Sequence, residues 1–256
     1  MTSVDSAPER SLLYRFGENC RPAIDYILAA HSQVGDPPVF DPAQFPWTAD
    51  LSAGWETIAA EAAHVVRDLG AVPPLYELSP DHRGIADPDR WRSFFLWGYG
   101  YRSDENCALC PETTRLLERV PELNSAFFSI LKPHAHIPRH AGVTKAILTC
   151  HLGLQTPRAG RCEMAVDDTV VKWREGECLV FDDTYEHEVW NDTDEIRIVL
   201  LIQFRRPVRQ PGRFVRDLFI EAVRRSPFVQ EARQNFYSWD RNLRAMDRAA
   251  GPFSPR

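Results

Sequence analysis

The sequence predicts a mainly β protein in which helices flank a barrel or sandwich core. Short β-prone runs follow one another between residues 126 and 204, each bounded by turn signals, whereas apolar residues before and after this zone recur at helical spacing. Hydrophobic residues make up 44% of the 256 residues and charged residues 26%, which is enough apolar surface for a packed core. We therefore expect a single domain of residues 1–256.

The first part of this domain, residues 1–120, is predicted to form a layer of helices and loops. Residues 22–33 and 53–69 have the helical pattern, and in the second segment apolar side chains recur at Trp55, Ile58, Ala62 and Val65. Prolines break any regular element between these helices. They are Pro37, Pro38, Pro42, Pro46, Pro73, Pro74, Pro80 and Pro88.

The β core is predicted for residues 121–207. Its expected strands are residues 127–131, 144–154, 162–166, 170–173, 177–181, 188–190 and 195–204. Along the second of these, Ala146, Leu148, Cys150 and Leu152 face one way, and Lys145, Ile147, Thr149 and His151 face the other. The helical pattern returns after Pro207 and Pro211, so residues 208–256 are predicted to form C-terminal helices, one of them around residues 228–248.

Charge and composition narrow the classes of partner. The net charge of −6 and the pI of about 5.8 lack the basic footprint of a general nucleic-acid binder. The longest strongly apolar stretch, residues 198–202, is far too short to span a membrane. Six scattered cysteines do not form a disulfide framework, and the single C-x-x-C of Cys107 and Cys110 is only half of a zinc site. We expect a cytoplasmic protein without nucleic-acid or membrane partners, and its oligomeric state stays open.

Histidines are concentrated in the β core. Five of the eight lie between residues 134 and 187, at His134, His136, His140, His151 and His187. Neutral imidazole is the commonest metal ligand in proteins, and rigid strands hold such ligands in place. His140 and His187 each lie beside a predicted strand at a turn, which makes them the best candidates for metal ligands. Taken singly, each could equally be a satisfied core or surface histidine.

Arg197 lies on a predicted core strand, where it shares one side with Val199, Leu201 and Gln203. A buried guanidinium without an anion would cost several kcal/mol. A bound carboxylate is its natural partner. Histidines for Fe(II), together with an arginine, a hydroxyl and an imidazole for carboxylates, are the residue types that an iron site with 2-oxoglutarate requires. A facial triad would place a carboxylate two residues after the first histidine, but Gly142 stands there.

These residues resemble the aspartyl/asparaginyl β-hydroxylases, which are Fe(II)- and 2-oxoglutarate-dependent oxygenases with a double-stranded β-helix, a jelly-roll or cupin-like barrel. The resemblance covers roughly residues 50–207. It rests on SIL at 129–131, HAGVT at 140–144, CHLGL at 150–154, WREGECLVFDD at 173–183, EHEVW at 186–190 and Arg197. A weaker match extends upstream through Trp91, Phe94 and Phe95 to NCALCP at 106–111.

The resemblance implies a role for each matched residue. His140 and His187 correspond to the two histidines that bind iron, and a water replaces the missing carboxylate. His151 and Arg197 correspond to the pair that holds the distal carboxylate of 2-oxoglutarate, and Ser129 to a hydroxyl on the same cofactor.

Two further positions follow from the resemblance. Asp183 corresponds to an acid that lies near the metal without binding it. Thr149 stands where the family often has a basic residue, and Lys145, on the same face of that strand, is the candidate to reach the second carboxylate. His134 and His136 have no ligand role in the family pattern and are predicted to lie in a loop.

The implied activity is hydroxylation of an unactivated C–H bond with O2, releasing succinate and CO2. The expected substrate is the β-carbon of an aspartyl- or asparaginyl-like amino acid, peptide or natural-product intermediate. Two protein ligands leave more positions of the metal to solvent, so halogenation or cyclisation stays open as an outcome. The alternatives are a non-catalytic cupin-like module that binds a metal and a small carboxylate, and a zinc hydrolase, for which a third protein ligand is missing.

Overall fold

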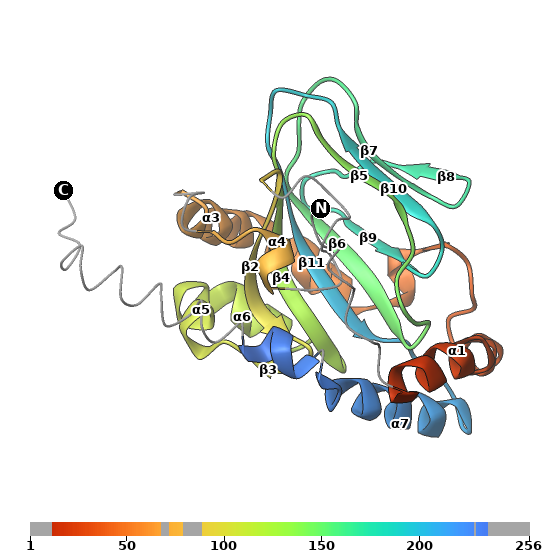
Figure 1. Cartoon of the computed structure of the whole chain (residues 1–256). Coiled ribbons are helices and arrows are strands. Elements are labelled where there is room, and N and C mark those ends of the chain that lie inside the picture. The colour runs from red at the N-terminus through yellow and green to blue at the C-terminus, as the bar shows by residue number, and fades with distance from the viewer. Residues whose placement is uncertain (1–11, 68–71, 79–88, 228, 235–256) are drawn as a thin grey trace, which may run out of the picture.

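Two antiparallel β-sheets face one another across an apolar layer (Figure 1). The structure is a computed structural model, which describes residues 12–67, 72–78, 89–227 and 229–234. The seven-stranded sheet has the order β1-β9-β6-β11-β4-β2-β3, and the four-stranded sheet has the order β5-β10-β7-β8. The first consists of β1 (Val39–Phe40), β2 (Trp91–Gly98), β3 (Tyr101–Arg102), β4 (Leu123–Leu131), β6 (Ile147–Gln155), β9 (Cys178–Phe181) and β11 (Arg197–Arg205). The second consists of β5 (Ala135–His140), β7 (Cys162–Val166), β8 (Thr169–Val171) and β10 (His187–Asn191).

The chain winds back and forth between the two sheets from β4 to β11. The strands β4, β6, β9 and β11 belong to the larger sheet, and the strands between them in the sequence, β5, β7, β8 and β10, belong to the smaller one. This winding is that of a double-stranded β-helix, the jelly-roll of cupins. The predicted fold class, a mainly β jelly-roll core with flanking helices, is confirmed.

Four strands lie where the sequence analysis expected helices or loops, namely β1, β2 and β3 within residues 1–120, and β5. Strand β2 belongs to the larger sheet, although residues 1–120 were expected to contain only helices and loops; its sequence, WRSFFLWG, is buried on both faces and lacks alternation. Strand β5 contains Pro138 and was interpreted as a loop. It is an edge strand of the smaller sheet, the position at which a sheet tolerates proline.

The helices cover the outer face of the larger sheet and its lower end (Figure 1). They are α1 (Leu12–Ala30), the 3-10 turn η1 (Pro42–Gln44), α2 (Trp47–Ala53), α3 (Trp55–Val65), α4 (Leu75–Leu78), α5 (Asp104–Leu109), α6 (Pro111–Leu117) and α7 (Gly212–Arg224). The helices expected at 22–33 and 53–69 thus correspond to α1 and α3, and α1 starts ten residues before the expected boundary. Of the helix expected around 228–248, only residues 229–234 are described, and they are helical. Among the described helices, none has the length and apolar character that crossing a bilayer requires.

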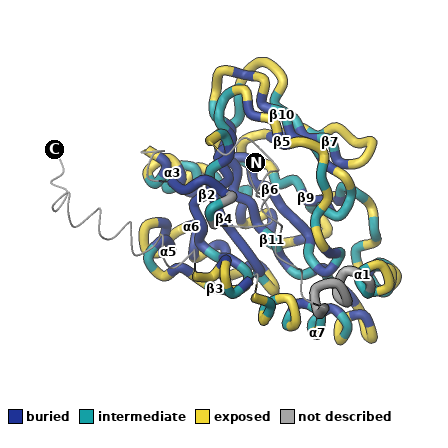
Figure 2. Tube along the Cα trace, viewed as in Figure 1, coloured by how far each residue is buried: buried dark blue, intermediate teal, exposed yellow. Residues whose placement is uncertain are grey.

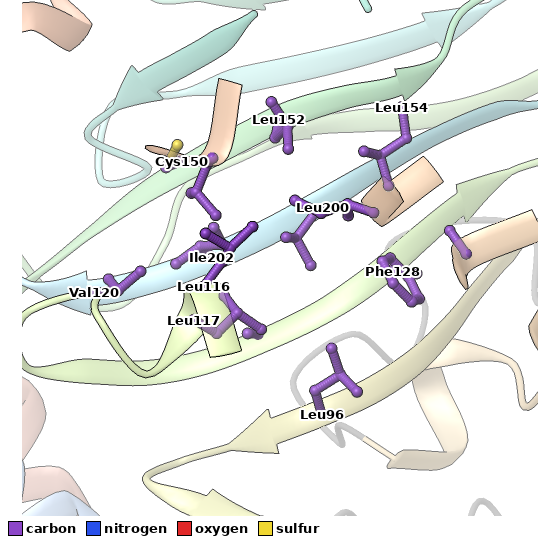
Figure 3. Close-up of a cluster of buried hydrophobic side chains, with 14 of the residues drawn as sticks. Leu96, Leu116, Leu117, Val120, Phe128, Cys150, Leu152, Leu154, Leu200 and Ile202 are labelled. Atoms are coloured by element: carbon purple, nitrogen blue, oxygen red, sulfur yellow. The ribbon is translucent and has the colours of Figure 1, made fainter. Parts of the chain in front are cut away.

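The alternation along β6 divides its side chains between two cores. Leu148, Cys150 and Leu152 are fully buried between the larger sheet and the helices, together with Phe128 and Leu200 (Figures 2 and 3). The opposite face of the same strands packs against the smaller sheet, and its buried residues include Phe127, Leu131, Phe181 and Val199. Polar side chains on this inner face, between the two sheets, therefore lie among buried apolar residues.

Candidate functional site

The two candidate metal ligands are cross-strand neighbours. His140 is the last residue of β5 and His187 the first of β10, and the antiparallel register places them directly opposite each other. Their ring centroids are 4.1 Å apart, and the ring of Phe181 from the larger sheet lies 5.8 Å from that of His187. Both imidazoles therefore share one face of the smaller sheet, the face turned toward the larger sheet.

Each of these imidazoles has one nitrogen bound to a backbone carbonyl. His140 Nδ1 lies 2.8 Å from the carbonyl oxygen of Pro138, and His187 Nδ1 lies 2.9 Å from that of Tyr185. A carbonyl only accepts, so Nδ1 carries the proton and donates, and the lone pair is on Nε2. Burial lowers the pKa of both histidines, that of His187 to about 4, with His140 as the second cause. Both rings are thus neutral and each presents an unprotonated Nε2, as metal-ligating histidines do.

Residue 142 has no room for the carboxylate that a facial triad would place there. The Gly142 N–H donates to the Asp183 carbonyl oxygen at 2.6 Å, and a Cβ on Gly142 would lie only 2.6 Å from Asp183 Cγ. Asp183 itself accepts a hydrogen bond from Thr149 Oγ1 at 3.1 Å, and burial raises the pKa of its carboxyl to about 7, with Asp182 as the next cause. The described residues contain no group of three or more side chains that could together hold a metal ion.

Gly142→Ala is expected to lower the free energy of unfolding by about 1–3 kcal/mol, because its methyl group overlaps the Asp183 side chain. Denaturant unfolding in the wild-type and the Asp183→Ala backgrounds measures the coupling. The alanine should cost clearly less in the second background, where the overlapping carboxyl is gone. An equal cost in both would show that the close approach at Gly142 does not involve this side chain.

Three arginine side chains are fully buried in the described part of the protein, and Arg197 is the one of them without a carboxylate partner. Among the described residues, the largest fully buried side chains include Arg197, Arg206 and Arg216. Arg206 is bound to Asp36 and Asp182, and Arg216 to Glu122 and Asp217. Arg197, in contrast, has Nε and Nη1 buried without a hydrogen-bond partner. Burial lowers the pKa of its guanidinium to about 10. A buried cation with two unpaired donors is what an anion-binding site looks like without its anion.

Ser129 and His151 share the inner sheet face with Arg197. In the register of β11 with its neighbours, Val199 is opposite Ser129 and Leu201 is opposite His151. His151 Nε2 is buried without a partner, whereas its Nδ1 accepts from Trp173 Nε1 at 3.1 Å. Ser129 Oγ accepts from Trp91 Nε1 at 3.0 Å. The three predicted carboxylate-binding residues are thus brought to one face, from three adjacent strands.

Sequence reasoning missed three polar groups of this face. The two indole N–H groups of Trp91 and Trp173 were interpreted as part of the family motif without a role. Ser93 lies opposite Ser129, is fully buried, and its hydroxyl has no partner. No sequence signal identified it, because residues 91–98 were not predicted to form a strand; once β2 is known, Ser93 is the polar residue between Trp91 and Phe95 on one side of it.

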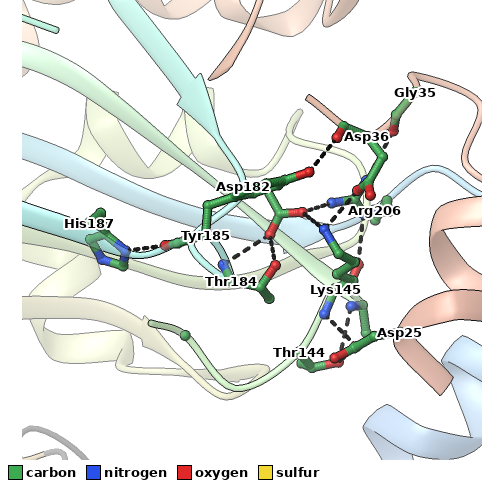
Figure 4. A network of polar contacts seen from close by, with 12 residues as sticks. Asp25, Gly35, Asp36, Thr144, Lys145, Asp182, Thr184, Tyr185, His187 and Arg206 are labelled. Carbon is green, nitrogen blue, oxygen red and sulfur yellow. Dashed lines mark hydrogen bonds and ion pairs between the residues drawn. The ribbon is translucent and has the colours of Figure 1, made fainter. Parts of the chain in front are cut away.

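This face receives no free positive charge from Lys145, which is already paired, or from position 149, where an uncharged threonine stands. The Lys145 ammonium is bound by Asp36 and Asp182, each at 2.8 Å, so it is already paired with two carboxylates (Figure 4). The expectation that it reaches a cofactor carboxylate therefore conflicts with its ion pairs, and Thr149 binds Asp183 instead. The sequence placed Lys145 on the correct face, but the loop that carries Asp36 lies 109 positions away in the chain and was not foreseeable.

The same ion-pair network supports the turn that carries His187. Asp182 is fully buried, is bound by Arg206 and Lys145, and accepts hydrogen bonds from the N–H and hydroxyl of Thr184 (Figure 4). The Tyr185 hydroxyl donates to the carbonyl oxygen of Asp36 at 2.7 Å. The turn from Asp182 to Tyr185 is therefore held at both ends, and this fixes the Tyr185 carbonyl that orients His187.

The remaining histidines and the C-x-x-C lie elsewhere. His136 is in β5 rather than in the expected loop, and its Nε2 lies 2.6 Å from a carboxylate oxygen of Glu188. His134 is in the preceding turn, as predicted, and contacts Asp194. Cys107 and Cys110 are buried in and after α5, and burial raises the pKa of both thiols, that of Cys110 to about 12. The two thiols are thus protonated core side chains.

Two known hydroxylases are similar to this chain in sequence. The chain is 37% identical over 216 residues, 84% of its length, to an ornithine lipid ester-linked acyl 2-hydroxylase of Rhizobium tropici, and the match covers 77% of that protein. It is 34% identical over 166 residues, 63% of its length, to the human aspartyl/asparaginyl beta-hydroxylase, and there the match spans only 21% of the relative.

Among solved structures, a Pseudomonas putida prolyl-4-hydroxylase superimposes with a TM-score of 0.39 at 18% identity, covering 62% of this chain and 99% of that one. The family model described as aspartyl/asparaginyl beta-hydroxylase matches residues 52–207. This range agrees with the roughly 50–207 that the motifs indicated, and it contains every site residue named in the sequence analysis. The chain belongs to the aspartyl/asparaginyl β-hydroxylase family of 2-oxoglutarate oxygenases.

Proposed function

We propose that this protein is an Fe(II)- and 2-oxoglutarate-dependent dioxygenase in which His140 and His187 bind the iron. The observation that carries the proposal is the pair of neutral imidazoles on the inner face of the smaller sheet, each with its Nδ1 bound to a backbone carbonyl. The unpaired guanidinium of Arg197 lies on the inner face of the larger sheet, which faces them. When bound, iron would supply the activation of O2 that C–H hydroxylation requires. The protein supplies ligands already oriented by backbone carbonyls, which is the arrangement that fixes metal-binding histidines.

The donor set beside the histidines suits a dicarboxylate. The guanidinium of Arg197, the Nε2 of His151 and the hydroxyl of Ser129 lie on one inner sheet face, buried between the sheets. In our proposal they hold the distal carboxylate of 2-oxoglutarate and orient its keto-acid end toward His140 and His187. Asp183, held by Thr149, lies against the backbone of Gly142 and limits what can approach the metal from that side.

For the substrate, we favour the acyl chain of an amino-acid-containing lipid over an aspartyl or asparaginyl side chain. The relative with the larger covered share, 84% of this chain, is named for hydroxylation of an ester-linked acyl chain. The segment at the start of β6 offers Thr149 rather than a free cation to the inner sheet face, because Lys145 is paired. Just beyond His140, the side chain of Val143 is 57% exposed. These features suit an apolar chain better than a carboxylate.

Two parallel assays of succinate release test this function. Purified protein with Fe(II), 2-oxoglutarate and O2 receives either an ornithine lipid with an ester-linked acyl chain or a peptide containing aspartate and asparagine. We expect succinate and a singly hydroxylated acyl product with the lipid, and background release with the peptide. Succinate release with the peptide and not with the lipid would show that the substrate is the β-carbon of an aspartyl or asparaginyl residue. A protein that binds metal and 2-oxoglutarate but turns over neither would favour the non-catalytic cupin-like module.

A further inference from the structure

His151 has the indole of Trp173 as its hydrogen-bond partner. The indole Nε1 lies 3.1 Å from His151 Nδ1, and both side chains are buried. An indole N–H can only donate, so Nδ1 of His151 must accept and cannot itself be protonated. Burial, and next the charge of Arg197, lower the pKa of His151 well below its ordinary value, which keeps the ring neutral. A neutral imidazole that accepts at Nδ1 has its single proton at Nε2.

That proton has no acceptor within the described part of the protein. His151 Nε2 is buried without a partner, as are Nε and Nη1 of Arg197. On the other side of β11, Trp91 donates to Ser129 Oγ at 3.0 Å, which leaves the hydroxyl proton of Ser129 available to a different acceptor. The two tryptophans thus act alike, since each occupies the acceptor atom of a neighbour and directs the remaining proton away from itself.

Trp173 also contacts the cation of the same site. The guanidinium carbon of Arg197 lies 4.7 Å from the centre of the Trp173 ring. Trp173 therefore contacts Arg197 through its ring and donates to Nδ1 of His151 through its N–H. With its proton at Nε2, His151 adds a second donor beside the guanidinium of Arg197, and two neighbouring donors match the acceptor-only carboxylate.

We propose that Trp173 is a positioning residue that holds His151 in the Nε2–H tautomer, so that His151 and Arg197 both offer donors to the distal carboxylate of 2-oxoglutarate. This inference rests on the proposed function for the identity of the ligand. Trp173 itself need not touch that ligand, because it acts through His151.

The test uses Trp173→Phe, which keeps an aromatic ring beside Arg197 and removes the N–H. Nitrogen NMR of histidine-labelled protein reports the tautomer, with the His151 signals assigned by their loss in His151→Gln. Calorimetry of 2-oxoglutarate binding to the Mn²⁺-loaded protein without O2 reports affinity. We expect wild-type His151 to be protonated at Nε2 only, the variant to show protonation at Nδ1, and its affinity for 2-oxoglutarate to fall about tenfold.

Trp47→Phe is the matched control, because Trp47 packs against Phe204 in the core under the helices. It should change neither readout. Protonation of wild-type His151 at Nδ1 would overturn the inference without any variant, even if Trp173→Phe failed to fold. A weaker affinity with unchanged His151 signals would also overturn it, since Trp173 would then act by packing alone. Failure of the wild-type protein to bind 2-oxoglutarate would instead refute the proposed function, while the spectrum would still decide the tautomer.

Discussion

Arg197→Met is expected to abolish 2-oxoglutarate binding without weakening the fold. Methionine has a similar length and no charge, so the variant removes a buried guanidinium whose Nε and Nη1 have no protein partner. Removing an unpaired buried charge is neutral or stabilising for the protein alone. Charge-assisted hydrogen bonds to a carboxylate contribute roughly 1.5–3 kcal/mol each, so two of them correspond to a loss of affinity of a hundredfold or more. Calorimetry and thermal unfolding of the ligand-free protein measure the two effects.

Arg206→Met is the control for Arg197→Met. Arg206 is just as buried, but it is bound to Asp36 and Asp182 within the protein. Its removal leaves Asp182 buried with Lys145 as its remaining cation, which should lower the free energy of unfolding by about 3 kcal/mol or more. Added 2-oxoglutarate should raise the melting temperature of wild-type protein and leave that of Arg197→Met unchanged. A large drop in the melting temperature of ligand-free Arg197→Met would contradict the view that Arg197 binds a ligand rather than a group of the protein.

His187→Ala is expected to lower metal affinity by roughly a hundredfold or more, and activity with it. Only two protein side chains are proposed to bind the ion, so the variant removes one of two ligands. Even replacing a residue that only hydrogen-bonds to a metal ligand lowers metal affinity tenfold to a hundredfold. Titration of Mn²⁺ into metal-free protein measures the affinity, and the visible charge-transfer band of Fe(II) with 2-oxoglutarate under argon measures assembly of the site. The band should be absent in the variant.

His136→Ala distinguishes a ligand from a nearby histidine. His136 lies on β5 four residues before His140, on the exposed side, where it is stacked beside Trp190. Its replacement should leave metal affinity and the band unchanged. If His136→Ala weakened the metal as much as His187→Ala does, the assignment of the two ligands would be wrong.

Much of the site could be predicted from sequence because it depends on local alternation and on short motifs. The period of two along β6 correctly placed His151 and Thr149 on the face opposite Leu148 and Cys150. The same rule identified Arg197 as a core residue in need of an anion, and the structure shows its donors unpaired. These inferences need only the direction of neighbouring side chains, which the strand itself determines.

Other features depend on segments that are distant in the chain. The pairing of Lys145 with Asp36 and Asp182 removed it from the cofactor-binding set, and no local pattern reports where the loop at residue 36 will lie. Strand β2 was missed because a strand buried on both faces does not alternate. Strand β5 was missed because Pro138 argues against a strand unless its edge position is known.

Periodicity and spacing along the chain determined a β core with flanking helices, and the motifs, through their resemblance to a family, indicated the jelly-roll and the residues proposed to bind metal and carboxylate. Only the tertiary structure decided which of those side chains are still without partners. The register of β5 with β10 brings His140 and His187 together, and packing of Trp173 on His151 and Arg197 gives the site its polarity. The physical reason is that a hydrogen bond or an ion pair is a property of two groups, and the chain orders them independently of their separation in sequence.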